Sequence, residues 1–350
     1  MAVLSIVLLF VHSLVFFVSD ALAAKVISYS VSRALPGNGY PLPRSISERS
    51  NTLELLSNNK SRGAYYATVE VGTPAQKLSL LLSTGSSDIW IISNSALSCK
   101  DRNCVTTFNP NTSQTISTVT AGGFDINYYD GSYARGDYIK DLFAVGENGE
   151  ARMVLQIGLA NNISDATGNY GGIMGIDYSS QVAASEPYPN LVDQMVGSGL
   201  TNTRLYSIWL NSINSDSGSI LFGGIDTEKY YGTLYSMPIH KDISGNYTTF
   251  TVGLTSLSTT PADSSTIPIT NSSFSTGVLL DSSTTAIYLP KDVVKIIYDQ
   301  FEVTFVNGTA FVDCKYSNSS YMTFAFESGS VVNVAYSELV NKLLVPSRPN

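Results

Sequence analysis

The sequence predicts a mostly β protein with two similar lobes, and two observations support this prediction. From Tyr65 onward, short runs of β-branched and aromatic residues alternate with Gly, Asn and Ser, which is typical of strands joined by turns. In addition, residues 81–91 (LLSTGSSDIWI) and 279–289 (LLDSSTTAIYL) align without a gap. Such a repeat indicates two related units. We expect a pseudo-two-fold axis to bring the repeated segments together at a central cleft between the lobes, where sites tend to lie.

The composition fits a large folded core. The chain has 350 residues, of which 43% are hydrophobic and 14% are charged, so disorder is not expected. The formal net charge is -8 and there is no basic cluster. A nucleic-acid partner is therefore not expected.

The N-terminus has the pattern of a signal peptide, which we place at residues 1–23. An apolar run from Val3 to Val18 precedes Ala21-Leu22-Ala23, an A-x-A cleavage site. A membrane anchor is the alternative, since no Lys or Arg precedes the run, although the run is short for a span of ~20 residues. We expect secretion, with the protein either free outside the cell or associated with the cell wall, and no transmembrane span after cleavage.

Residues 24–62 have weak periodicity and are expected to form a propeptide-like arm. We then place an N-terminal lobe at 63–235 and a C-terminal lobe at 236–350. Strands are predicted, in order, at YYATVEVG, KLSLLLS, DIWIIS, FDINYYD, MVLQIGLA, LYSIWL, GSILFGG and GVLLD. Helical spacing predicts helices at 191–197 and 291–301.

The three cysteines suit an oxidising compartment. Cys99 and Cys104 enclose four residues and are expected to form a small disulfide loop, whereas Cys314 has no evident partner. With no C-x-x-C motif and two histidines in the chain, a zinc site is not expected. Sequons that predict a glycosylated surface begin at Asn59, Asn111, Asn162, Asn246, Asn271, Asn307 and Asn318.

Several segments between Tyr65 and about Ser337 resemble, in their sequence and their order, the pepsin-like (A1) aspartic peptidases. The resemblance is closest to the secreted fungal members of the yapsin and candidapepsin type. YYATVEVGTPAQKLSLLLSTGSSDIWI is similar to the first active-site region, and GVLLDSSTTAIYLP to the second. FDINYYDGSYARGDYIKD is similar to the flap hairpin that closes over substrate. GGIMGID resembles the segment that threads behind the first turn, and GSILFGGIDTEKY resembles a marker of the lobe boundary.

The resemblance implies a bilobal pepsin-like acid protease fold, and amide hydrolysis at acid pH by two carboxylates that share a proton, without cofactor or metal. It places the catalytic positions at Ser83 and Asp281, and the disulfide loop at Cys99 and Cys104. Substrate-binding flap residues would be Tyr128, Asp130, Gly131 and Ser132. Support for the turns would come from Thr84, Gly85, Ser282, Thr284 and Trp90. The expected partner is an extended peptide or protein substrate in the interlobe cleft, bound by a monomer.

The chain departs from the family pattern at four places. Ser83 stands where the family has its first catalytic aspartate, and a serine cannot ionise near neutrality or share a low-pKa proton. Ser283 replaces a glycine and would be strained if that position needs a positive φ. Tyr129 replaces a flap glycine and is expected to alter the hairpin tip. Finally, the counterpart of residues 172–175 would fall at 370–373, after Asn350, so the second lobe is expected to be incomplete.

Three interpretations follow from these departures. The chain is an aspartic endopeptidase by descent that is inactive or strongly impaired, a pseudopeptidase that binds peptides or a partner without cutting them, or a product whose second lobe does not fold stably. A serine hydrolase built on Ser83 is not favoured, because there is no G-x-S-x-G context and His240 is the one candidate base outside the signal segment. Asp88, five residues after Ser83, is expected to be structural.

Overall fold

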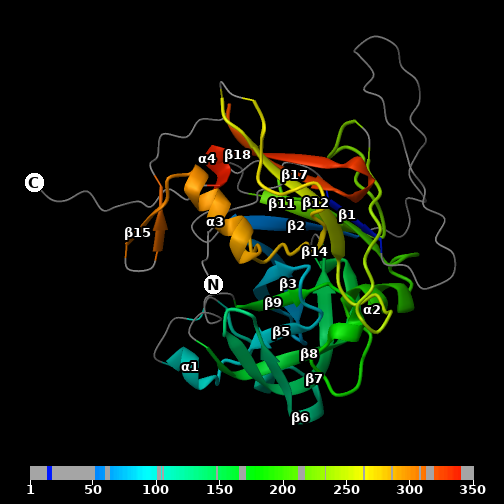
Figure 1. Cartoon of the computed structure of the whole chain (residues 1–350). Helices are drawn as coiled ribbons and strands as arrows, with labels where there is room; N and C mark the ends of the chain where they lie inside the picture. The colour runs from blue at the N-terminus through cyan, green and yellow to red at the C-terminus, as the bar shows by residue number, and fades with distance from the viewer. Residues whose placement is uncertain are drawn as a thin grey trace, which may run out of the picture.

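The structure, a computed structural model, is mostly β, and its elements group into two lobes (Figure 1). The pepsin-like bilobal class predicted from the sequence is therefore confirmed. Helices are few and short, and the two lobes meet near strands β2 and β11. The described residues are 14–17, 52–59, 64–100, 104, 106–146, 149–164, 171–211, 217–232, 234–262, 265–284, 287–306, 309–312 and 319–339.

An eleven-stranded sheet forms the first lobe and the lobe boundary. An additional pairing of β3 with β7 folds part of this sheet back on itself. The pairings are antiparallel except for β4 with β9 and β5 with β8. In sheet order the strands are β1 (Leu14–Phe17), β10 (Leu205–Trp209), β11 (Ser217–Phe222), β2 (Thr52–Asn59), β3 (Ala64–Val71), β4 (Gln76–Ser83), β9 (Gly172–Gly175), β5 (Ile89–Ile92), β8 (Ala151–Ile163), β7 (Tyr133–Val145) and β6 (Ser117–Asn127).

The second lobe is built on a smaller sheet. Its central strand β12 (Thr251–Thr260) pairs with β13 (Ile267–Pro268), β14 (Thr276–Leu279) and β17 (Tyr321–Phe326), and β17 pairs with β18 (Val331–Ala335). A separate hairpin joins β15 (Thr304–Val306) to β16 (Thr309–Phe311). Helix α3 (Lys291–Gln300) buries Val293 and Ile297 in the core of this lobe, and α4 (Tyr336–Leu339) follows β18.

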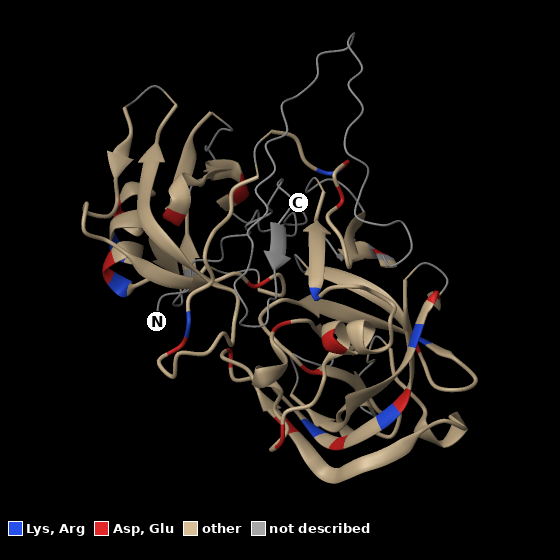
Figure 2. Ribbon diagram, turned by 90° about the vertical axis from the view of Figure 1, so that its right-hand side faces the viewer, with Lys and Arg blue, Asp and Glu red and all other residues tan. Residues whose placement is uncertain are grey.

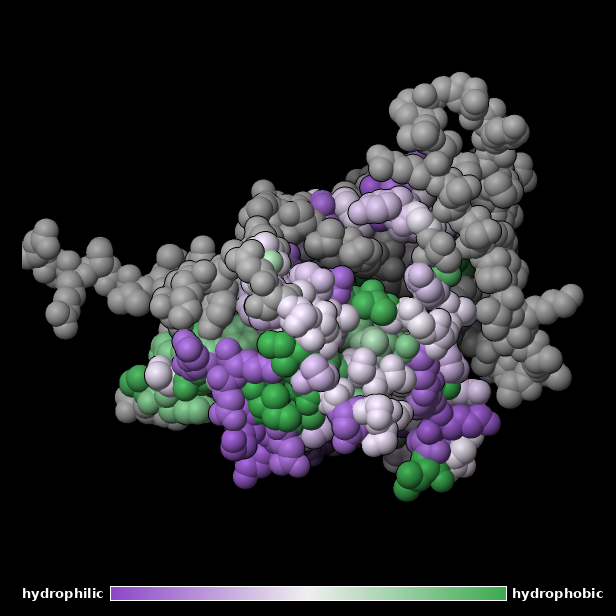
Figure 3. Space-filling view, turned by 45° about the horizontal axis from the view of Figure 1, so that its top comes forward, coloured by the Kyte–Doolittle hydropathy of each residue, from purple (hydrophilic) through white to green (hydrophobic). Residues whose placement is uncertain are grey.

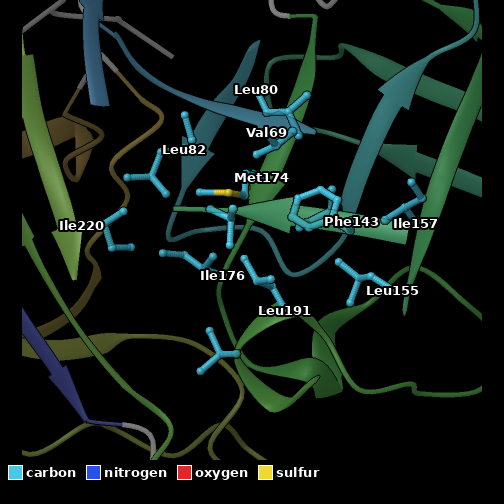
Figure 4. Packing of buried hydrophobic residues seen from close by; sticks show 14 of the residues in the cluster. Val69, Leu80, Leu82, Phe143, Leu155, Ile157, Met174, Ile176, Leu191 and Ile220 are labelled. Atoms are coloured by element: carbon cyan, nitrogen blue, oxygen red, sulfur yellow. The ribbon is translucent and has the colours of Figure 1, made fainter. Parts of the chain in front are cut away.

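Each lobe has its own apolar core, and Ile239 and Leu280 contact both. Around Met174 of β9 the first core gathers side chains from several strands and from helix α2 (Leu191–Gly197) (Figure 4). That helix begins at Asn190, whose side chain accepts a hydrogen bond from the Asp193 amide, a typical N-cap. Leu280, directly before Asp281, packs against the cores of both lobes. The second repeated segment is therefore anchored at the lobe boundary.

The predicted elements agree well with the observed ones. The two predicted helices correspond to α2 and α3, and every predicted strand run overlaps a strand. A short helix α1 (Leu97–Lys100) lies beside the disulfide between Cys99 and Cys104, which the structure contains. Cys314 and most of the predicted signal peptide and arm lie outside the described residues.

Two strands fall in segments that were expected to lie outside the lobes. Strand β2 lies in the predicted arm, yet it pairs with both β11 and β3. Every second residue of this strand, namely Thr52, Glu54 and Leu56, is buried, as expected for a strand with one face in the core. One of the three is an acid, so the buried face does not read as apolar in the sequence. Backbone amides of Thr68 and Gly146 donate to the Glu54 carboxylate, which makes the acid compatible with the core. Strand β1 lies within the predicted signal peptide and pairs with β10.

Charged residues are scattered over the molecule. Along the ribbon of Figure 2, the positions of lysines and arginines in the described residues are interspersed with those of acids. Figure 3 shows polar and apolar side chains interleaved over the described part of the face it presents. Among the helices of the described residues, none combines the length and the hydropathy needed to span a bilayer.

Candidate functional site

The first repeated segment places a tight turn at the lobe boundary. Strand β4 ends at Ser83 and β5 begins at Ile89, and β9 lies between these two strands in the sheet. The Ile176 amide donates to the Ser83 carbonyl at 3.0 Å, and the Asp177 amide donates to the Ser86 carbonyl at 2.9 Å. Residues 83–88 are thus held from behind by the segment that sequence analysis expected to thread there.

Close backbone approach explains why a glycine ends β9. A Cβ at Gly175 would lie 2.5 Å from the Asp88 carbonyl oxygen, nearer than real Cβ atoms come. A side chain here would push the turn away from β9, so the GGIMG sequence allows the two segments to pack.

The second repeated segment presents Asp281 opposite Ser83. After β14, the Leu280 amide donates to the Phe250 carbonyl. The Asp281 carboxylate accepts two hydrogen bonds at Oδ1, from the Ser283 amide at 2.9 Å and from Ser283 Oγ at 2.7 Å. Asp281 is partly exposed, and Thr284 lies exposed at the end of this turn.

Thr84 and Ser282 join the two turns reciprocally. The Thr84 hydroxyl accepts from the Ser282 amide at 2.9 Å and donates to the Leu280 carbonyl at 2.8 Å. The Ser282 hydroxyl accepts from the Thr84 amide at 3.2 Å and donates to the Leu82 carbonyl at 3.0 Å. Four hydrogen bonds related by approximate two-fold symmetry therefore cross the lobe boundary. The structure thus brings the predicted positions 83 and 281 together.

A chain of hydroxyls connects those two positions. Ser83 Oγ donates to Ser283 Oγ at 3.1 Å, and Ser283 Oγ donates to Asp281. The Gly85 amide donates to Ser83 Oγ at 3.3 Å, mirroring the bond from the Ser283 amide to Asp281. Ser283 does not have a positive φ, so the strain considered for this substitution does not arise.

The predicted flap is a hairpin of β6 and β7 with a tip at residues 128–132. Trp90 Nε1 donates to the Tyr128 hydroxyl at 2.7 Å, which ties the flap to β5 directly after the first turn. Within the tip, the Ser132 amide donates to the Asp130 carboxylate, and Gly131 has a φ of 85° that favours glycine.

Tyr129 joins the flap to the other lobe. Its side chain is 73% exposed, and its ring meets the ring of Tyr288 edge-on with 5.5 Å between centroids. Tyr288 lies in the second repeated segment, seven residues after Asp281. The flap tip therefore contacts a neighbour of each turn, through Trp90 on one side and Tyr288 on the other.

Comparison with known proteins agrees with this geometry. The family model described as eukaryotic aspartyl protease matches residues 64–345, most of the chain. The chain belongs to the eukaryotic aspartyl protease family. Among curated relatives, it is 34% identical over 327 residues to a probable aspartic-type endopeptidase opsB of Aspergillus oryzae, covering 90% of this chain and 65% of the relative. It is 33% identical over 295 residues to secreted aspartic protease 6 of Candida albicans, covering 80% of this chain and 65% of the relative. The chain thus spans slightly less than two thirds of the length of these relatives.

In this member of the aspartyl protease family, sequence reasoning missed the buried acid that lies behind the two turns. Asp177 follows β9 and is almost fully buried, and the Tyr178 amide donates to its carboxylate. Burial, and to a smaller extent the charge of Asp281, raises the pKa of Asp177 to about 8. Its position two residues after the glycine that ends the threading segment is the signal that could have identified it.

Asp88 and His240 are engaged elsewhere. The fully buried Asp88 carboxylate accepts hydrogen bonds from Tyr138, Tyr188 and the Ala183 amide, and burial raises its pKa. His240, the one histidine in the described part of the chain, pairs with Glu327 at 2.9 Å. The Ser83 hydroxyl is instead hydrogen-bonded to Ser283 and to the Gly85 amide.

Proposed function

We propose that this chain is a secreted aspartic-type endopeptidase homologue that, with the sequence it has, hydrolyses peptide bonds negligibly or far more slowly than an enzyme with both carboxylates. The observation that carries this proposal is the pairing of a hydroxyl at Ser83 with the carboxylate of Asp281 across the two turns. Extracellular location is supported by the secreted Candida relatives and by the predicted signal peptide.

The chemical reason is that one carboxylate cannot do the work of two. In the family mechanism, one carboxylate takes a proton from water while its protonated partner polarises the scissile carbonyl. Among the acids of residues 83–88 and 281–284, Asp88 is bound within the core, which leaves Asp281 alone at the hydroxyl chain. Loss of a general acid or base typically lowers the rate by ~10²–10⁴, and residues that act as a unit are non-additive.

The direct test is cleavage of a denatured protein at pH 3–5 by the purified wild-type chain and by Asp281→Asn. We expect little or no cleavage by either protein. Cleavage by the wild type that Asp281→Asn abolishes, and that is as fast as cleavage by an aspartic peptidase with both carboxylates assayed in parallel, would show that a single carboxylate suffices, and the proposal would then be wrong.

A second candidate function is peptide binding without cleavage. The flap contacts favour it, because Tyr128 and Tyr129 hold the flap tip beside both turns. An extended peptide between the flap and the turns would need no second carboxylate. Fluorescence anisotropy with labelled eight-residue peptides tests this candidate. Tyr128→Ala is expected to weaken binding, whereas Tyr235→Ala, at an exposed position in a different segment, is the matched control.

A further inference from the structure

We propose that Ser83 and Ser283 are a coupled pair, in which the side chain of Ser283 fits because residue 83 is small. In this proposal Ser283, in addition to Ser83, keeps the site from hydrolysing peptides. The inference rests on the proposed function, because it takes position 83 as the place of a missing carboxylate. It predicts that restoring Asp at 83 is not sufficient.

The first turn shows what a carboxylate demands of the residue that faces it. A Cβ at Gly85 would lie 2.7 Å from the Asp281 carboxyl carbon and 2.8 Å from its Oδ2. Real Cβ atoms do not approach so closely, so something would have to shift. A side chain at 85 would therefore force the Asp281 carboxyl group to move from the position it has.

The second turn presents the mirror image of this contact. Thr84 and Ser282 exchange equivalent hydrogen bonds, and the amides of Gly85 and Ser283 make equivalent bonds to residues 83 and 281. Residue 283 therefore faces residue 83 as Gly85 faces Asp281. A Cβ at 283 would meet the carboxyl group of an aspartate at 83, whereas the smaller Ser83 leaves room for it.

The Ser283 hydroxyl adds a second obstacle. It lies 3.1 Å from Ser83 Oγ and 2.7 Å from Asp281 Oδ1, within hydrogen-bond distance of both positions. In the Ser83→Asp variant the carboxylate oxygens would lie one bond beyond the present Ser83 Oγ, and a water bound jointly by the two carboxylates would lie between them and Asp281. The hydroxyl therefore occupies the region where the reacting water of a restored pair would lie.

The experiment compares Ser83→Asp with the double variant Ser83→Asp/Ser283→Gly in full-length protein. Cleavage of a denatured protein at pH 3–5 is expected to be at least about tenfold faster for the double variant, as for recovery of an acid–base group. Its Tm is expected to be about 3 °C or more above that of Ser83→Asp, because overpacking at 283 is relieved.

Two matched controls separate the causes. Ser83→Asp/Ser283→Ala keeps the Cβ and removes the hydroxyl, and we expect its Tm to stay close to that of Ser83→Asp. Ser83→Asn has the size of aspartate without the charge, and Ser283→Gly should raise its Tm too. A Tm gain seen with Asp and not with Asn would assign the coupling to repulsion from Asp281 and overturn the steric account.

The outcomes are distinguishable from those that test the proposed function. Equal rates and equal Tm values for Ser83→Asp and the double variant would overturn the coupling. If neither variant cleaves, the role of Ser283 in preventing hydrolysis is overturned, and the Tm comparison then decides the coupling, which the absence of a gain from Ser283→Gly would overturn as well. Asp281-dependent cleavage by the wild type at the rate of an aspartic peptidase with both carboxylates would instead contradict the proposed function, and it is measured without any of these variants.

Discussion

Thr84 and Ser282 each use one hydroxyl to bind the other's backbone amide, so the two lobes are joined at their turns by side chains that both accept and donate. The arrangement satisfies amides and carbonyls that the turns would otherwise leave unpaired at the lobe boundary. It persists in this chain although position 83 carries no carboxylate. We infer that its role is structural and separable from catalysis.

Thr84→Val should therefore lower the free energy of unfolding of the protein without changing the side chains at positions 83 and 281. The variant keeps the shape of the side chain and leaves the Ser282 amide and the Leu280 carbonyl without this partner. The expected loss in the free energy of unfolding is about 1–3 kcal/mol for each unsatisfied buried group. Urea unfolding measures it, with Thr118→Val on an exposed part of β6 as the control. An equal, small effect of both substitutions would contradict a structural role for Thr84.

Asp177 should make the protein less stable as the pH rises. Its pKa is raised from an ordinary value of 3.8 to about 8, mainly by burial. A raised pKa in the folded state contributes stability that is fully present below the unfolded pKa and is lost as the pH rises toward 8. The contribution to the slope is at most about 1.4 kcal/mol per pH unit.

The measurement is the difference in Tm between wild type and Asp177→Asn from pH 4 to 8. Asp177→Asn should lack the loss of stability that deprotonation of Asp177 causes as the pH rises. The Tm of the variant should therefore increase relative to that of the wild type as the pH rises. Asp88, whose pKa burial also raises, titrates in both proteins and largely cancels in the difference. Asp125→Asn, at an exposed ion pair with Arg135, is the control. Parallel profiles for wild type and Asp177→Asn would show that this acid does not titrate in the folded protein over that range.

Sequence patterns predicted the elements that repeat or alternate. The gapless match of residues 81–91 with 279–289 was enough to predict that Ser83 and Asp281 meet, since a repeated turn at a pseudo-two-fold axis must face its copy. The flap was predicted from the resemblance of FDINYYDGSYARGDYIKD to the flap hairpin of the pepsin-like aspartic peptidases. By contrast, β2 was missed because its buried face includes the acid Glu54, which pairing with backbone amides makes tolerable.

The chemistry at the turns could be predicted only in part. The serine at position 83, in place of the family's aspartate, can be identified from the sequence. The hydrogen bond between Ser83 and Ser283 cannot, because it joins side chains 200 positions apart. The same holds for Asp177, whose environment includes Tyr206 and the facing turn, both distant in sequence, in addition to its neighbour Tyr178.

Asp88→Ala should destabilise the protein strongly, although Asp88 takes no part in the hydroxyl chain. Its carboxylate accepts from Tyr138 at 2.8 Å, from Tyr188 at 2.6 Å and from the Ala183 amide at 2.7 Å. Truncation leaves two buried tyrosine hydroxyls and the amide of the exposed Ala183 without this acceptor, for an expected loss of roughly 3 kcal/mol in the free energy of unfolding. Thermal unfolding at pH 5 tests this, with Asp125→Ala on the exposed part of the flap as the control. A loss no larger than that of the control would show that the tyrosines find other partners.

Tyr129→Gly should loosen the flap. The ring contact with Tyr288 joins the hairpin tip to the second lobe, and an edge-on aromatic pair is worth about 0.5–1.5 kcal/mol beyond its buried area. Loss of this contact should speed hydrogen exchange of the Tyr128 and Gly131 amides about 2- to 13-fold, the range to which that energy corresponds. Glycine itself adds backbone freedom, so Tyr288→Ala, which leaves the flap sequence intact, is the decisive comparison. It should speed exchange at the same amides although it lies in the other lobe. Exchange that Tyr129→Gly accelerates and Tyr288→Ala leaves unchanged would assign the effect to glycine, and the Tyr129–Tyr288 contact would then not be what holds the flap.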